Sequence, residues 1–226
     1  MSRFITNASK GSRSLIPGNI VGSITQDGYY IAQKVLPSDI ADEVVLKTIK
    51  KIDEELYFKL IDRGFTEFAF MKLLTNGRNS LKSFDEMLDG ADEVVPLAKG
   101  VEGMDELGFF TDWRKLEEYI SGVKRPGKLE KLFDDKGNAL IRFPDYFDGA
   151  LLKEVKNGRQ SLSANIKKQI EKDVRAMETN VIDTAEWHFY PSSAGTKGKV
   201  SLGPSKALLE YLKKQKPKIK VVIHTP

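Results

Sequence analysis

The order of hydrophobic patterns in the second half of the chain is the feature that most restricts its fold. After a helical pattern over residues 112–124, apolar and β-branched residues predict two strands joined by a turn, then a helix, a strand, a helix and a strand. The expected strands cover residues 139–143, 150–156, 185–190 and 219–224, and the last two helices follow Gly158 and Ser205. Strands that alternate with helices form a sheet covered by helices. We therefore expect an α/β fold over residues 111–226.

The first 110 residues carry a different pattern. Apolar residues recur at helical spacing between Ile40 and Ile61, and Gly64 is the expected end of that helix. Shorter helices are expected over residues 67–74 and 83–90, and a strand over residues 28–35; in the second half, a further short helix is expected over residues 128–133. We therefore divide the chain into a mainly helical N-terminal region, residues 1–110, and a second domain, residues 111–226. From its position alone, we expect the first region to serve delivery or to act as a linker.

The composition limits the kinds of metal site that the chain can build. The sequence has no cysteine, and its only histidines are His188 and His224. Disulfides, thiolate zinc sites and histidine-rich sites are therefore excluded. Any bound metal must be held by carboxylates, which favours hard cations such as Mg²⁺, Mn²⁺ or Ca²⁺. No run of 18 apolar residues is present, so we expect no stable membrane insertion.

Charge is distributed unevenly along the chain. The net charge is −4 over residues 1–110, zero over residues 111–150 and +8 over residues 151–226, which together give the total of +4. A basic C-terminal third suits a polyanionic partner such as nucleic acid. The alternative is that these lysines only keep helix surfaces solvated.

Three residues near the expected hairpin suggest catalytic chemistry. Glu154 and Lys156 lie two apart on a strand and therefore share a face, and a turn at residues 148–149 brings Asp145 back alongside them. Two carboxylates can hold a divalent cation, and an ammonium can orient water or stabilise charge on a phosphate. The alternative is a solvated Glu–Lys pair on one face of a strand.

The residues around this hairpin resemble a known family. The segments Arg142–Asp145 and Glu154–Asn157 are similar to those of restriction-endonuclease-fold, or PD-(D/E)xK, nuclease domains at the C-termini of bacterial polymorphic and contact-dependent-inhibition toxins. The segments at residues 187–190, 203–209 and 219–224 resemble the closing strand, helix and strand of such domains. The resemblance covers roughly residues 112–226.

The resemblance implies roles for several residues. Asp145 and Glu154 would be the metal ligands and Lys156 the catalytic lysine. Family members often carry a further acid on the helix before the hairpin, for which Glu130 is the candidate; Glu117 or Glu118 could serve instead, and Glu130 could equally be a solvated helix residue. Many members also carry a glutamine early in the following helix, where this chain has Asn165, with Gln169 one turn later.

Three further residues have a functional and a structural interpretation. Asp148 is an alternative acid, but its place before Gly149 is explained by the turn. His188 could face the site and touch phosphate, or could be a packed strand residue. His224 lies in the last expected strand, and no other feature of the sequence supports a functional role for it.

The resemblance implies a metal-dependent nuclease toxin that hydrolyses phosphodiester bonds, with Mg²⁺ or Mn²⁺ as cofactor. The family includes enzymes that cleave DNA and enzymes that cleave tRNA, and we expect DNA as the substrate because the sequence shows no aromatic platform for RNA bases. Such a domain would be secreted or delivered as part of a larger toxin and would act in the cytoplasm of the target bacterium. It would require a cognate immunity protein, for which an acidic surface would fit the basic C-terminal third. The alternatives are a tRNA- or RNA-cleaving toxin of the same fold, a repair or restriction nuclease, and a degenerate nuclease fold that only binds.

Overall fold

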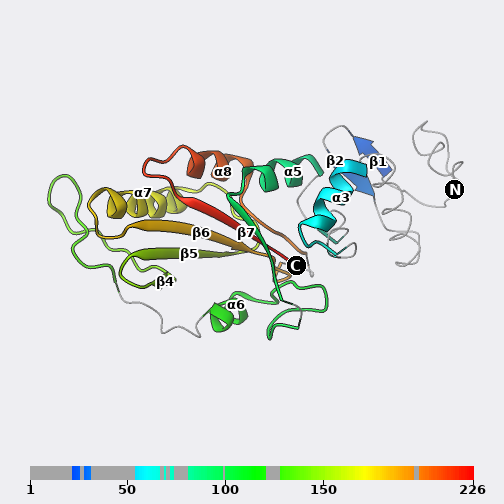
Figure 1. The fold of residues 1–226 in the computed structure, drawn as a ribbon, viewed down its shortest axis with the longest axis horizontal. Helices are drawn as coiled ribbons and strands as arrows, with labels where there is room; N and C mark the ends of the chain where they lie inside the picture. Colours follow the sequence, from blue (N-terminus) through cyan, green and yellow to red (C-terminus); the bar gives the residue numbers. More distant parts are fainter. Residues whose placement is uncertain are drawn as a thin grey trace, which may run out of the picture.

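The computed structural model shows an α/β fold built on a five-stranded mixed sheet flanked by helices (Figure 1). It describes residues 22–25, 28–31, 54–66, 69, 72–73, 81–98, 100–120, 128–195 and 199–226. The α/β arrangement expected for the second half of the chain is therefore confirmed.

The sheet has the strand order β3-β7-β6-β5-β4. Its strands are β3 (Glu93–Pro96), β4 (Tyr146–Phe147), β5 (Leu151–Asn157), β6 (Thr184–Tyr190) and β7 (Lys220–Thr225). Strands β3, β7, β6 and β5 run parallel, and β4 pairs antiparallel with β5 at the edge. The register places Glu154 beside Trp187 and Lys156 beside Phe189, so these four side chains share one face of the sheet.

Helices cover the two faces unequally. Helix α7 (Ala164–Glu178) connects β5 to β6, and helix α8 (Lys206–Lys213) connects β6 to β7. With α5 (Leu81–Gly90) they lie on one side of the sheet, and α6 (Trp113–Ile120) lies on the other (Figure 1). The hydroxyls of Ser163 and Ser205 accept hydrogen bonds from backbone amides in the first turns of α7 and α8 and so fix where these helices begin.

The main hydrophobic core lies between the sheet and α5, α7 and α8. Trp187 and Phe189 are fully buried there, together with residues of α3 (Glu54–Asp62) and α5 such as Leu60 and Phe84. A smaller cluster on the opposite face contains Phe110, Leu116 and Tyr190. Because β3 pairs with β7, and because α3 and α5 share the main core, these elements pack with the sheet although they precede residue 110.

Close packing between α5 and the loop before α8 is visible at one glycine. Gly203 has a φ angle of 77°, and a Cβ atom at this position would lie 2.0 Å from the sulfur of Met87. A side chain at residue 203 would therefore strain the backbone and displace Met87.

Two expectations for residues 128–143 were wrong. Residues 128–133 form no helix, and residues 139–143 form no strand of the sheet. Instead the Leu129 amide donates to the Arg142 carbonyl and the Leu140 amide to the Leu132 carbonyl, so the two segments pair as an irregular arm. Lys131 has a φ angle of 60°, which interrupts any helix. The first strand of the hairpin is only β4, because Pro144 has no amide hydrogen to donate to β5.

The other expected elements agree with the described residues. Strands β5, β6 and β7 and helices α5, α7 and α8 match the predicted positions, as does α6, although residues 121–127 lie outside the described part. Helix α3 ends before Gly64, whose φ angle is 88°, and residues 40–53 of that predicted helix are not described. Of the predicted helix 67–74, only residues 69, 72 and 73 are described, and they are helical. Of the strand expected over residues 28–35, residues 28–31 form β2 (Gly28–Ile31), which pairs with β1 (Gly22–Thr25), and residues 32–35 are not described.

Strand β3 was not expected from the sequence, since four residues give too short an alternation to identify a strand.

Among the helices that the structure describes, none combines the length and the apolar character that crossing a bilayer requires.

Candidate active site

The structure brings Asp145, Glu154 and Lys156 together around strand β5. Asp145 directly precedes β4, and its amide donates to the Lys153 carbonyl at 3.2 Å. Its carboxylate oxygen Oδ2 accepts a hydrogen bond from the Val155 amide at 2.8 Å. The side chain of Asp145 is thereby fixed to β5 between the positions of Glu154 and Lys156.

Lys156 is held by three groups on the side of the sheet that α7 covers. Its ammonium forms an ion pair with Glu154 Oε1, donates to Gln169 Oε1 at 3.1 Å, and lies 4.9 Å from the centre of the Trp187 ring. Gln169 and Asn165 both lie on α7, but the side chain of Gln169 is partly buried and that of Asn165 is exposed. Of the two residues considered for the glutamine position, Gln169 is therefore the one that contacts the lysine.

Arg142 is a member of the site to which the sequence analysis gave no role. Its side chain is 3% exposed, and its Nη2 donates to Glu154 Oε2 at 2.8 Å. Its Nε and Nη2 also donate to Asp173 at 2.6 and 3.0 Å, and its Nη1 donates to the Phe143 carbonyl at 3.0 Å. Burial lowers the pKa of Arg142, but the hydrogen bonds and charges of Asp173 and Glu154 outweigh burial and keep the pKa above its ordinary value.

Asp173 on α7 is the second residue that the sequence analysis missed. It is fully buried and also accepts a hydrogen bond from the indole Nε1 of Trp187 at 3.0 Å. A signal was present in the sequence, because Asp173 falls at helical spacing from Ile166, Ile170 and Met177 on the apolar face of α7. An acid at such a position requires a buried partner.

The carboxyl group of Asp145 lies in an environment that disfavours its charge. Burial raises the pKa of Asp145, and the negative charge of Glu154 raises it further, to about 6. The hydrogen bond from the Val155 amide and the positive charges of Lys156 and Arg142 act in the opposite direction without reversing the effect. Two neighbouring carboxylates with this mutual repulsion favour any cation that binds between them.

Other candidate acids lie outside this group. Glu130 is exposed on the irregular arm rather than on a helix. Glu117 and Glu118 belong to α6, which packs against the opposite face of the sheet through Leu116. Asp148 is exposed, and its Oδ1 accepts from the amides of residues 150 and 151, as expected for a turn residue.

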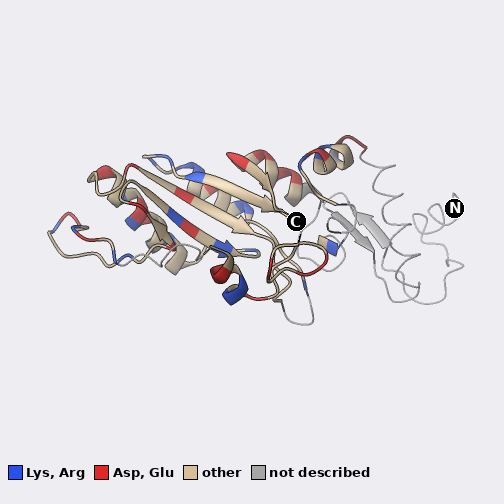
Figure 2. Ribbon diagram, turned by 60° about the horizontal axis from the view of Figure 1, so that its bottom comes forward, with Lys and Arg blue, Asp and Glu red and all other residues tan. Residues whose placement is uncertain are grey.

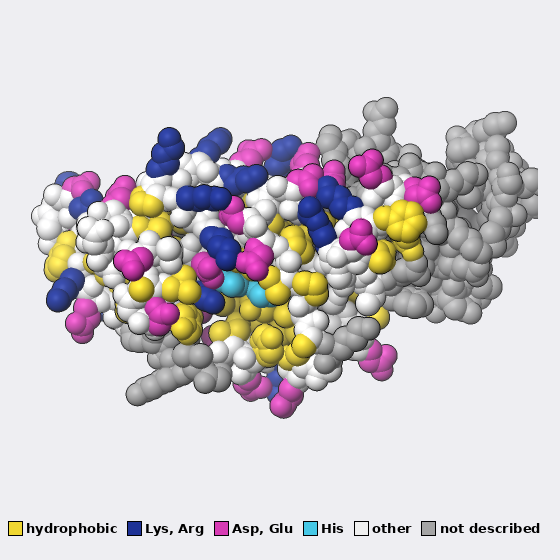
Figure 3. Space-filling view, viewed as in Figure 1, with side chains coloured by type: hydrophobic (Ala, Val, Ile, Leu, Met, Phe, Trp, Pro, Cys, Tyr) yellow, Lys and Arg dark blue, Asp and Glu magenta, His cyan; other side chains and the backbone are white. Residues whose placement is uncertain are grey.

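The two histidines lie on the face of the sheet opposite Glu154. His188 Nε2 lies 2.8 Å from Glu186 Oε2, and His188 Nδ1 lies 2.9 Å from His224 Nε2. The His224 ring is stacked on Tyr190 with 3.9 Å between ring centres, and its buried Nδ1 has no hydrogen-bond partner among the residues that the structure describes. Figure 3 shows the histidine atoms beside acidic and hydrophobic side chains of this face. His188 is therefore a packed strand residue that does not face Glu154.

Burial governs the titration of both histidines. It lowers the pKa of His188 against the raising effect of Glu186, and it lowers the pKa of His224 to about 3, with the charges of His188 and Lys153 acting in the same direction. Both rings are therefore neutral at pH 7.

The donor set of the candidate site suits a hard divalent cation. Asp145 and Glu154 supply carboxylate oxygens, which Mg²⁺ and Mn²⁺ prefer. Within the described ranges, no group of three or more His, Asp and Glu side chains is placed to hold a metal ion. A cation bound by Asp145 and Glu154 would therefore complete its coordination with water or substrate oxygens, as Mg²⁺ commonly does.

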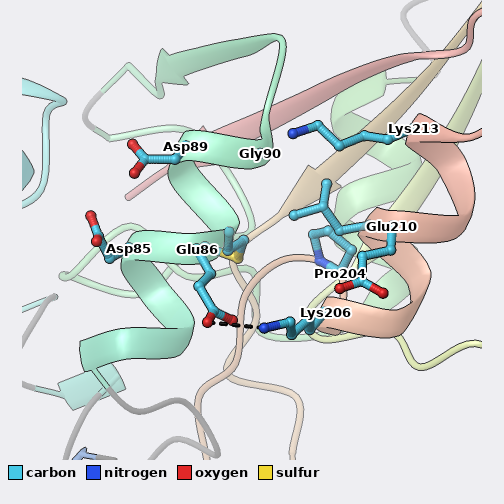
Figure 4. A pocket seen from close by; sticks show the side chains of 10 residues that line it. Asp85, Glu86, Asp89, Gly90, Pro204, Lys206, Glu210 and Lys213 are labelled. Atoms are coloured by element: carbon cyan, nitrogen blue, oxygen red, sulfur yellow. Dashed lines mark hydrogen bonds and ion pairs between the residues drawn. The ribbon is translucent and has the colours of Figure 1, made fainter.

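The surface charges and a groove elsewhere add little to this site. Figure 2 shows acidic and basic bands side by side on the strands and helices. A groove of about 340 Å³ lies between α5 and α8 (Figure 4), where Lys206 forms an ion pair with Glu86 at 3.1 Å. Its lining mixes acids with lysines and shares no residue with the group around Glu154.

Comparisons of the chain with protein-family models, with curated proteins and with solved structures gave no match.

Proposed function

We propose that the chain is a metal-dependent endonuclease that hydrolyses phosphodiester bonds, with Asp145, Glu154 and Lys156 as its catalytic residues. The observation that carries the proposal is the convergence of two carboxylates and one ammonium at β5, with Asp145 bonded to the Val155 amide and Lys156 paired with Glu154. The resemblance of the segments 142–145 and 154–157 to PD-(D/E)xK nucleases supports the same residues and the finer assignment of a restriction-endonuclease-like sheet.

Each residue has a distinct role in this proposal. Asp145 and Glu154 hold Mg²⁺ or Mn²⁺, which when bound polarises the scissile phosphate and lowers the pKa of coordinated water. Lys156 stabilises negative charge on the phosphate oxygens and orients the attacking water. Gln169 and the Trp187 ring keep the ammonium of Lys156 in place.

The wider biological proposal follows the same resemblance. The domain acts as a toxin in bacterial competition, is delivered as part of a larger protein into the cytoplasm of the target bacterium, and cleaves DNA. The net charge of +8 over residues 151–226 supports a nucleic-acid substrate and an acidic immunity protein as partner. RNA cleavage, or a role in repair or restriction, would use the same catalytic residues.

A cleavage assay tests this function. Plasmid DNA and total tRNA are incubated with the protein in Mg²⁺, in Mn²⁺ and in EDTA, and wild type is compared with Asp145→Asn and Lys156→Met. We expect cleavage of DNA that requires metal and is lost in both variants. Asp148→Asn is the matched control, because Asp148 lies in the same hairpin but is exposed, and its hydrogen bonds to described residues come from Tyr146 and from the amides of residues 150 and 151. Cleavage that survives both substitutions would place the active site elsewhere, and cleavage of tRNA alone would make the protein an RNase.

A further inference from the structure

We propose that Arg142 competes with a divalent cation for Glu154 and thereby sets the metal concentration at which the candidate site fills. This inference rests on the proposed function for the location of the metal ligands. It concerns the regulation of that site by a residue that the family resemblance leaves without a role.

The hydrogen bonds of Arg142 show that it is anchored without Glu154. Its Nε and Nη2 donate to the two oxygens of Asp173, and its Nη1 donates to the Phe143 carbonyl. Only the second hydrogen of Nη2 is directed to Glu154. Arg142 can therefore release Glu154 and keep three of its four hydrogen bonds and one carboxylate partner.

Glu154 accepts from a cation at each of its oxygens. Its Oε2 is bonded to Arg142 and its Oε1 to Lys156, and the residue is 4% exposed. A divalent cation binds a carboxylate oxygen at roughly 2.0–2.6 Å and repels neighbouring positive groups. Coordination by Glu154 therefore places the metal ion beside two positive groups, and the repulsion between these charges weakens at least one of the two contacts.

Arg142 is the partner that can give way at the lower cost. When it leaves Glu154, its charge remains compensated by Asp173 at 2.6 Å. Among the described residues, Lys156 also contacts the neutral Gln169 and the Trp187 ring, and the charge of Asp145 acts on it without a direct hydrogen bond. Lys156 therefore depends on Glu154 more than Arg142 does. The exchange that admits a metal ion is thus the loss of the bond between Arg142 and Glu154, with Arg142 held by Asp173.

A purely supporting role for Arg142 predicts the opposite result. If the guanidinium only orients Glu154 as a ligand, its removal weakens metal binding. If it competes with the metal, its removal strengthens metal binding. The sign of the change in Kd therefore decides between the two roles.

The test is a calorimetric titration of the full chain with Mn²⁺ at pH 8. Removing Arg142 alone would leave Asp173 buried without a cation, which is strongly destabilising. The main variant is therefore Arg142→Met with Asp173→Asn, in which the amide oxygen of Asn can still accept from Trp187. We expect its Kd for Mn²⁺ to be lower than that of wild type by about tenfold, the equivalent of one charge-assisted hydrogen bond.

Two further proteins complete the experiment. Arg142→Lys keeps a charge near Asp173 but cannot bond both carboxylates, so its Kd should fall by roughly threefold even if the double variant fails to fold. Arg175→Met is the matched control. Arg175 lies on α7, as Asp173 does, but it pairs with Asp135 and the Phe133 carbonyl, and the Kd of this variant should equal that of wild type.

The outcomes separate this inference from the proposed function. An unchanged or higher Kd in the folded Arg142 variants, or no Mn²⁺ binding by any of the proteins, overturns the competition. The nuclease proposal is judged by metal-dependent cleavage by wild type and its loss in Asp145→Asn. A wild type that cleaves while the Arg142 variants bind Mn²⁺ more weakly would refute only the role given to Arg142.

Discussion

Replacing Asp145 by Asn should stabilise the folded protein while it removes the proposed activity. The change keeps the size of the side chain and an oxygen that can accept from the Val155 amide. It removes a carboxylate that is unfavourably placed, because burial and Glu154 raise its pKa to about 6. A carboxyl group whose pKa is higher in the folded state than in the unfolded chain lowers stability above that pKa, since folding then disfavours the charged form.

The size of this effect follows from the two pKa values. Raising the pKa from 3.8 to about 6 corresponds to an upper limit of about 3 kcal/mol at pH 8. Asp145 is only partly buried, so solvent screening reduces the expected gain to about 1–2 kcal/mol, or about 2–8 °C in Tm for a chain of this length. The gain should fall to roughly a third at pH 4.5, where most folded molecules carry a protonated Asp145.

Thermal and urea unfolding of wild type and Asp145→Asn at pH 8 and pH 4.5 measure this difference. The control is Asp148→Asn, which should lose stability at pH 8, because the amides of residues 150 and 151 lower the pKa of Asp148. The reasoning is refuted if Asp145→Asn is less stable than wild type at pH 8, or if its gain in stability is the same at both pH values.

Three further predictions concern other parts of the molecule. If Asp145 and Glu154 hold a cation, millimolar Mn²⁺ should raise the Tm of wild type but not that of Asp145→Asn, and an equal rise in both would contradict the assignment. The free energy of unfolding should fall as the pH drops from 6.5 towards 3, because burial lowers the pKa of His224 to about 3; the upper limit of this loss is about 5 kcal/mol. Urea titrations over this pH range should show a smaller loss of unfolding free energy in His224→Phe. Gly203→Ala should lower the free energy of unfolding by about 1–3 kcal/mol, since the new methyl group meets Met87; unfolding midpoints like those of wild type would show that α5 yields easily.

The elements that were predicted correctly are those with a strong local pattern. Strands β5, β6 and β7 are rich in apolar and β-branched residues, and helices α7 and α8 have serine caps and apolar residues at helical spacing. The approach of Asp145 to Glu154 and Lys156 also followed from local geometry, namely the alternation of a strand and a turn at Asp148.

The features that were missed depend on contacts between distant segments. Arg142 meets Asp173 across 31 positions of sequence, and nothing near Arg142 indicates that partner. Residues 128–133 have helical spacing, but pairing of Leu129 with Arg142 replaces the helix. Strand β3 forms because it pairs with β7. Its first residue, Glu93, is the register partner of Val222, which lies 129 residues later in the chain.

The interior position of β7 has a consequence for the order in which the sheet can form. β7 is the last of the five strands along the chain, yet it lies between β3 and β6. During synthesis, β4, β5 and β6 can associate early, while β3 has no neighbour until β7 arrives. Until then β3 and β6 each expose an unpaired edge, which is the kind of surface that chaperones bind and that other chains can join. The partly synthesised sheet should therefore be most prone to aggregation in the interval before β7 leaves the ribosome.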